Sequence, residues 1–95
     1  MSEVTVFAKI TAKKGCAPQV LADLQNLVAL VHKEPGCIVY KLHQDNEQPE
    51  LFFFYEIWGS QALLDQHAAA PALTDFQKKT ADTVMSLEVW VTNPV

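Results

Sequence analysis

Residues 51–58 read LFFFYEIW, which predicts a β-strand with large apolar side chains on both faces. Successive side chains of a strand point to opposite sides, so the two sets are Phe52, Phe54, Glu56 and Trp58 against Leu51, Phe53, Tyr55 and Ile57. One layer of helices covers only one face of a sheet. Leaving two Phe and one Trp in water would forgo roughly 2 kcal/mol each, which is large beside a domain stability of about 5–15 kcal/mol. The stretch therefore predicts that another surface covers the second face.

The segments around this strand predict the order of the elements. β-Branched residues favour strands over 4–12, 37–44 and 85–92, in addition to 51–58. Apolar steps of three and four predict a helix over 17–33, with Pro18 in its first turn and Pro35-Gly36 as its stop. Ser60 is expected to cap a helix over 61–69, and Pro71 to begin another that reaches about residue 81. The order β-α-β-β-α-β predicts a single α+β domain over residues 1–95: a ferredoxin-like fold, with a four-stranded antiparallel sheet and its helices on one face.

The first and last strands carry the same two-sided pattern. One side of each is entirely apolar, with Val4, Val6, Ala8 and Ile10 in one strand and Met85, Leu87, Val89 and Val91 in the other. The opposite sides mix polar residues with Phe7 and Trp90. An amphipathic sheet face packs well against its own copy across a two-fold axis. We therefore expect a homodimer with the sheets face to face, the alternative being a monomer with scattered exposed aromatic residues.

Composition limits the classes of partner and compartment. Nearly half of the residues are apolar, and the net charge of −4 comes from acidic and basic residues mixed along the chain. Nucleic acids and anionic membranes require a clustered basic surface, so we expect neither as a partner. The sequence shows no signal peptide and no stretch of membrane-spanning length. We therefore expect a cytoplasmic protein in which Cys16 and Cys37 stay thiols.

Few titratable residues lie near the aromatic strands. His67 shares a helical side with Leu63 and Leu64, so it should point toward the sheet, either as a functional group or as a hydrogen-bonded core residue. Glu56 lies in a very apolar strand, where a carboxylate is either a base or orienting acceptor, or a structural hydrogen-bond or ion-pair partner. His32 and His43 are expected at the surface. The three histidines lack metal-ligand spacing, so no metal site is expected.

The stretches EPGCIVYKLHQD (residues 34–45) and LFFFYEIWGSQALLDQH (residues 51–67) resemble the antibiotic biosynthesis monooxygenase family of small dimeric α+β barrel proteins. That family begins its second strand with Glu-x-Gly-Cys-x-x-Tyr, ends its third with Glu-x-Trp, and follows with a helix that holds one His. The matching residues here are Glu34, Gly36, Cys37, Tyr40, Glu56, Trp58 and His67. The likeness spans nearly the whole chain.

The resemblance implies oxygenation of a small electron-rich phenol or quinol by O₂, without metal, flavin or haem. It implies an apolar pocket between helices and sheet, with His67 as the base and Glu56 as a second catalytic candidate. Tyr40, Trp58, Phe54 and Phe7 are the candidates for binding the substrate. The family often has a Pro-His pair where this chain has Pro71-Ala72, so one imidazole is missing. A non-catalytic module that binds small molecules or responds to stress, or an isomerase of the same fold, is the alternative.

Overall fold

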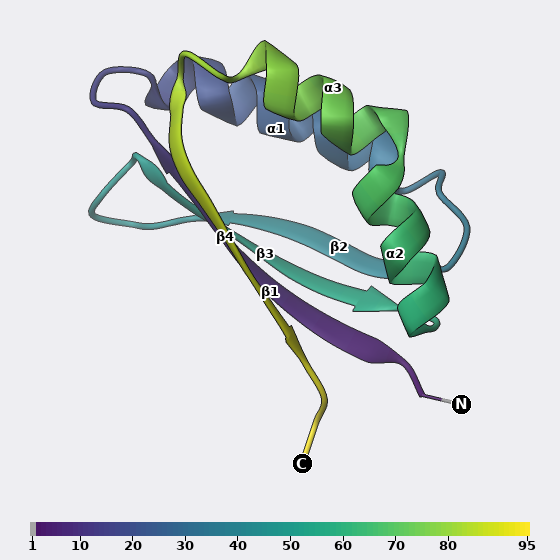
Figure 1. Cartoon of the computed structure of the whole chain (residues 1–95). Helices are drawn as coiled ribbons and strands as arrows, with labels where there is room; N and C mark the ends of the chain where they lie inside the picture. Colours follow the sequence, from purple (N-terminus) through teal and green to yellow (C-terminus); the bar gives the residue numbers. More distant parts are fainter. Residues whose placement is uncertain (1) are drawn as a thin grey trace.

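The structure is a computed structural model that describes residues 2–95. Its elements are β1 (Val4–Ala12), α1 (Ala17–Val31), β2 (Cys37–Gln44), β3 (Leu51–Trp58), α2 (Gln61–Ala69), α3 (Pro71–Lys79) and β4 (Val84–Thr92). The four strands form one antiparallel sheet in the order β2-β3-β1-β4. All three helices lie on the same face of this sheet (Figure 1). The predicted ferredoxin-like fold is confirmed.

Local sequence explains where the helices begin and end. Pro18 and Pro71 lie in the first turns of α1 and α3, and Ser60 caps α2 by accepting the Leu63 N–H at 3.2 Å. α1 ends at Val31, two residues before the predicted end, because the chain tightens into a turn in which Glu34 donates its N–H to the Val31 carbonyl at 2.9 Å. Likewise, α3 ends at Lys79 and not at residue 81. No helix within residues 2–95 is long and apolar enough to cross a membrane.

The core lies between the helices and one face of the sheet. Strand register places Tyr40, Glu56 and Val6 in one row across β2, β3 and β1, and Leu42, Phe54 and Ala8 in the next row. The helices cover these rows mainly with the apolar stripe of α1: Ala17, Val20, Leu24, Leu27 and Val31. The set of β3 side chains that contains Glu56 is therefore the buried one, and this carboxylate is held inside the protein.

The opposite face of the sheet has no helix over it. The β3 side chains that point to this face are Leu51, Phe53, Tyr55 and Ile57. The free-energy cost of leaving apolar side chains in water therefore applies to this set and not to the set with two Phe and one Trp. Phe7 lies between Tyr55 on one neighbouring strand and Trp90 on the other, which forms an aromatic row across three strands. Phe7, Tyr55 and Trp90 are 47%, 36% and 48% exposed, respectively. We refer to this surface as the open face.

The edge strand β4 is incompletely covered even on the side that faces the helices. Leu87 and Val89 pair with Ile10 and Ala8, which fixes their orientation toward that side. Both are nevertheless exposed, unlike their buried partners on β1. The helical layer therefore stops short of β4 and leaves an opening between helices and sheet.

Candidate active site

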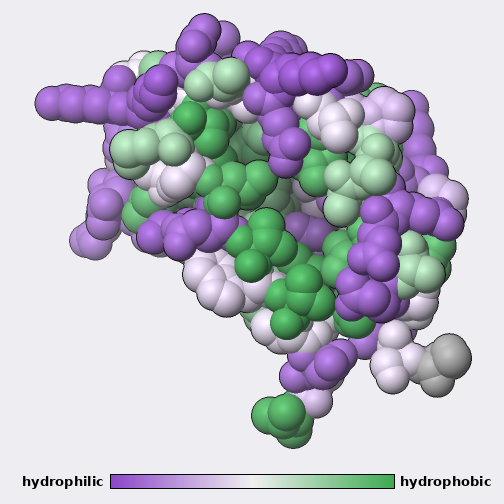
Figure 2. All heavy atoms as spheres, viewed as in Figure 1, coloured by the Kyte–Doolittle hydropathy of each residue, from purple (hydrophilic) through white to green (hydrophobic). Residues whose placement is uncertain are grey.

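A cavity of about 110 Å³ lies between the helices and the sheet and opens beside β4. Its lining is almost wholly apolar and comes from all four strands and all three helices. Figure 2 shows the hollow and the apolar side chains that gather around it. The polar side chains of the lining are Tyr40, Glu56 and His67. For comparison, a dry apolar cavity of about 150 Å³ in another protein binds benzene. A single aromatic ring would thus nearly fill this space, and a larger ligand would extend through the opening.

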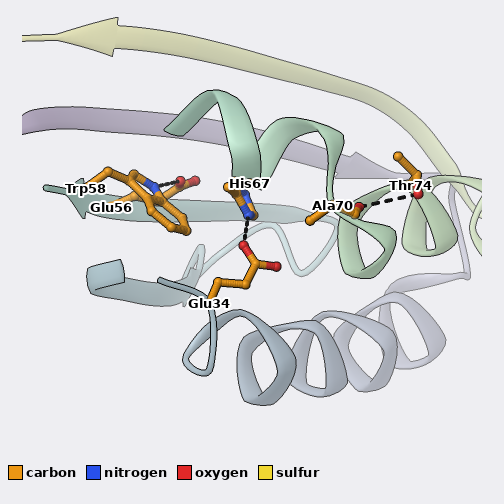
Figure 3. A network of polar contacts seen from close by, with 6 residues as sticks. All are labelled: Glu34, Glu56, Trp58, His67, Ala70 and Thr74. Carbon is orange, nitrogen blue, oxygen red and sulfur yellow. Dashed lines mark hydrogen bonds and ion pairs between the residues drawn. The ribbon is translucent and has the colours of Figure 1, made fainter. Parts of the chain in front are cut away.

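His67 reaches the cavity from α2, and its ring is fixed on three sides. The Trp58 indole stacks on it, with centroids 4.5 Å apart and planes 24° apart, and Tyr40 contacts it edge-on at 5.6 Å. Nδ1 lies 2.8 Å from Oε1 of Glu34, which belongs to the loop between α1 and β2 (Figure 3). The residue is only 5% exposed. The imidazole is therefore both packed and hydrogen-bonded, as expected for a residue whose orientation matters.

Glu56 places a carboxylate in the apolar wall of the same cavity. Its Oε1 accepts the Trp58 indole N–H at 2.9 Å, as Figure 3 shows. Burial raises the pKa of Glu56, and this effect outweighs the indole hydrogen bond and the attraction of His67, both of which lower it. The same carboxylate, after burial itself, contributes to raising the pKa of Tyr40. Tyr40 thus stays a protonated phenol, which is able to donate a hydrogen bond to a ligand and does not act as a base.

The family comparison gives a match to the model described as antibiotic biosynthesis monooxygenase over residues 3–79. This chain belongs to the antibiotic biosynthesis monooxygenase family. It is also 30% identical over 79 residues to the uncharacterized protein sll1783 of Synechocystis sp.. The match covers 83% of this chain but only 54% of the length of that protein.

Solved structures of similar chains support the same membership. The crystal structure of PA3566 from Pseudomonas aeruginosa is 28% identical, with a TM-score of 0.93, and the match covers 100% of this chain and 96% of that one. A crystal structure described as an antibiotic biosynthesis monooxygenase is 29% identical, with a TM-score of 0.88 over 97% of this chain and 98% of that one. The fold is thus that of this family.

Four of the six predicted site residues line the cavity and two do not. Tyr40, Phe54, Glu56 and His67 do. Trp58 is 0% exposed and lies behind His67, because it shares the inner face of β3 but fills the end of the core under α2. Phe7 points to the open face, since its neighbours Val6 and Ala8 occupy the inner one. Neither lines this cavity, and a role for either residue in binding a ligand stays a prediction.

The contact between Glu34 and His67 was not predicted from the sequence. Glu34 was visible only as part of the Glu-x-Gly-Cys-x-x-Tyr motif, 33 positions away from His67. The loop brings the two together because the chain turns at Gly36 and runs back along the sheet beneath α2. Ala72, at the position of the family's second His, packs beside the core and lies outside the cavity lining.

The raised pKa of Glu56 predicts how a Glu56→Gln substitution changes stability. A folded state with a raised carboxyl pKa binds protons more readily than the unfolded chain. The stability that protonated Glu56 contributes to the folded state is fully present below the ordinary carboxyl pKa of 4.5. This stability is lost as the pH rises through the higher pKa that Glu56 has in the folded protein. Glutamine keeps an oxygen for the Trp58 indole and cannot ionise. We expect the variant to unfold at a higher temperature than wild type at neutral pH.

Thermal unfolding from pH 4 to pH 8 measures this effect, and the advantage of Glu56→Gln should fade toward the acid end. Glu47→Gln, at an exposed glutamate, is the matched control and should show no such trend. A variant less stable than wild type at every pH would mean that the carboxylate is favourable where it lies.

Proposed function

We propose that this protein is a monooxygenase that oxidises a small hydroxylated aromatic compound with O₂, using His67 as the base and no metal, flavin or haem. The observation that carries the proposal is a histidine, fixed by stacking and by a carboxylate, at an apolar cavity the size of one aromatic ring. A base at the wall of such a cavity suits removal of a proton from a ring hydroxyl. Family membership makes oxygenation the reaction class to test first.

The reaction balances without an added reductant. His67 takes the phenol proton, and the phenolate supplies all the electrons that O₂ accepts. One oxygen atom forms a bond to a ring carbon that loses its hydrogen, and the other leaves as water, so that a phenol becomes a quinone. The apolar lining keeps the phenolate away from bulk solvent, and the Tyr40 hydroxyl and Glu56 are available to orient the ring. The apolar side chains of the lining also favour O₂, which is apolar.

Oxygen consumption tests the proposal directly. Purified protein treated with a chelator is mixed with a panel of phenols, hydroquinones and dihydroxynaphthalenes in an oxygen electrode, without added flavin. At least one compound should give protein-dependent uptake above its own autoxidation, with the quinone as product. If no compound does so while several still raise the melting temperature, the oxygenase proposal is wrong and a binding module is the better description.

A homodimer through the open face is part of the same proposal. The row formed by Tyr55, Phe7 and Trp90 would bury large aromatic surface against its copy, and Phe53 and Ile57 extend it on β3. Phe7 and Tyr55 already contact each other, with ring centroids 5.6 Å apart. An exposed apolar surface of this kind on one sheet face marks an interface more often than a solvent-exposed surface. Association of two sheets also agrees with the dimeric architecture that the family resemblance implies.

Phe7→Glu should therefore break the dimer. The substitution removes the central aromatic side chain and, across a two-fold axis, places two carboxylates in one interface. Loss of such a central anchor typically costs about 2 kcal/mol or more, which raises the dissociation constant at least about 30-fold. Sedimentation at micromolar concentration should show a dimer for wild type and a monomer for the variant.

Leu30→Glu provides the control for that measurement, because Leu30 is equally exposed but lies on α1, on the other side of the molecule. This variant should remain dimeric. Wild type that sediments as a monomer, or a dimer broken by Leu30→Glu and not by Phe7→Glu, would exclude the open face as the interface.

A further inference from the structure

The contact between His67 and Glu34 carries information about which ring nitrogen holds a proton. Glu34 is well anchored, because its N–H donates to the Val31 carbonyl at 2.9 Å and its carbonyl accepts from Cys37 at 3.4 Å. The side chains of His67 and Glu34 are 6% and 15% exposed. The 2.8 Å separation of Nδ1 and Oε1 is short for a hydrogen bond, as is typical when one partner is charged.

The chemistry of the carboxylate decides the direction of this hydrogen bond. An ionised carboxylate only accepts, so Nδ1 of His67 must donate. In the neutral imidazole the single proton then lies on Nδ1, and Nε2 carries the free lone pair. Nε2 has no hydrogen-bond partner among residues 2–95. Asp23 Oδ2 is the one side-chain nitrogen or oxygen in this range that is both sealed from solvent and unpartnered, so Nε2 is not fully sealed, and His67 lines the cavity.

Packing and hydrogen bonding therefore have separate tasks at this histidine. The stacked Trp58 and the edge of Tyr40 fix the plane of the ring, but neither chooses a tautomer. Glu34 is the group that distinguishes one nitrogen from the other. The neutral imidazole of free histidine prefers its proton on Nε2, so the form with the proton on Nδ1 requires such a partner.

We propose that Glu34 is a positioning residue, which holds His67 in the Nδ1–H tautomer so that Nε2 presents its lone pair to a hydroxyl group bound in the cavity. When Nε2 takes a proton, the resulting imidazolium lies against a carboxylate that is already in place, with no rearrangement of the protein. Other charged or titratable groups around the ring are Glu56 and Tyr40, and neither is bonded to it. The catalytic consequence rests on the proposed function, whereas the tautomer does not.

NMR of protein labelled with ¹⁵N at histidine tests the tautomer without any substrate. Spectra are recorded at a pH where the imidazole rings are neutral, and the His67 signals are identified by their loss in His67→Gln. Wild type should show a protonated Nδ1 and an unprotonated Nε2. Glu34→Gln, whose amide both donates and accepts, should lose this preference, and Glu34→Ala should shift the proton to Nε2. His32 and His43 provide internal controls in every spectrum, because neither is hydrogen-bonded to Glu34.

A second readout separates positioning from general structural support. Where wild type consumes oxygen, kcat should fall about 10- to 100-fold in Glu34→Gln with KM little changed, a loss typical of groups that orient a functional residue. Glu47→Gln should leave both unchanged. A wild-type His67 with its proton on Nε2, or a Glu34→Ala protein that keeps the Nδ1–H form, would overturn the inference. Absence of oxygen uptake would instead count against the proposed function alone, because the NMR result stands by itself.

Discussion

Alanine in place of His67 should lower quinol-dependent oxygen uptake by about 10² to 10⁴, the usual cost of removing a general base. The residue joins the cavity to the Glu34 carboxylate, and no other imidazole lines that cavity within residues 2–95. Glu56 does not replace it easily, because its Oε1 already accepts the Trp58 indole N–H. Steady-state oxygen consumption at saturating substrate measures the loss.

Removing His67 also removes the stacking partner of Trp58, so the assay needs evidence that the fold survives. The melting temperature and dimer content of His67→Ala are compared with wild type, and added imidazole should restore part of the activity through the space the side chain leaves. His43→Ala is the matched control, since His43 lies exposed on β2 and outside the cavity lining, and its dimer content is measured too because it points to the open face. Full activity in His67→Ala would reject this residue as the base.

The sequence predicted the fold well because its signals are local. Pro18, Pro71 and Ser60 mark helix starts by direct steric and hydrogen-bond effects, and these three positions agree with the structure. The ends of α1 and α3 were predicted about two residues too late, because helix ends depend on turns that form only when the chain packs. The large apolar side chains on both sides of LFFFYEIW indicated that both faces of the sheet are buried against another surface. The alternation of side chains alone could not show which of the two sets of side chains faces the helices.

The site was harder to predict because it depends on pairs of residues distant in sequence. His67 was singled out by its helical side, and the structure brings it to the cavity with Tyr40, Phe54 and Glu56. That Phe7 lies on the open face could not be predicted, because face assignment requires the register between β1 and β3. No spacing rule connects Glu34 with His67, since the turn at Gly36 decides how the loop meets α2. The geometry of that turn is thus the basis of the largest stability effect that we expect.

Gly36→Ala should destabilise the protein by about 2–5 kcal/mol. The residue has φ +80°, a left-handed conformation that costs a residue with a Cβ about 1–2 kcal/mol. A Cβ placed there would also lie 2.4 Å from Cδ1 of Leu63 and 2.8 Å from its Cβ and Cγ, all on α2. Overpacking of this kind typically adds about 1–3 kcal/mol. In a domain of this size, each kcal/mol lowers Tm by roughly 4–8 °C, so the loss in Tm should be at least about 8 °C.

Gly15→Ala separates the two causes of this loss. Gly15 has nearly the same backbone angle, φ +83°, but no atom lies within 4 Å of the position its Cβ would take. It should therefore show only the backbone cost of about 1–2 kcal/mol. The double variant Gly36→Ala with Leu63→Ala should recover part of the loss that the contact with Leu63 adds to the backbone cost. Leu63→Ala removes Cδ1 and Cγ but keeps the Cβ of residue 63. Equal destabilisation by Gly15→Ala and Gly36→Ala in thermal or urea unfolding would show that the contact with α2 is readily relieved. The loop that carries Glu34 would then be less tightly coupled to the helix that carries His67 than the geometry implies.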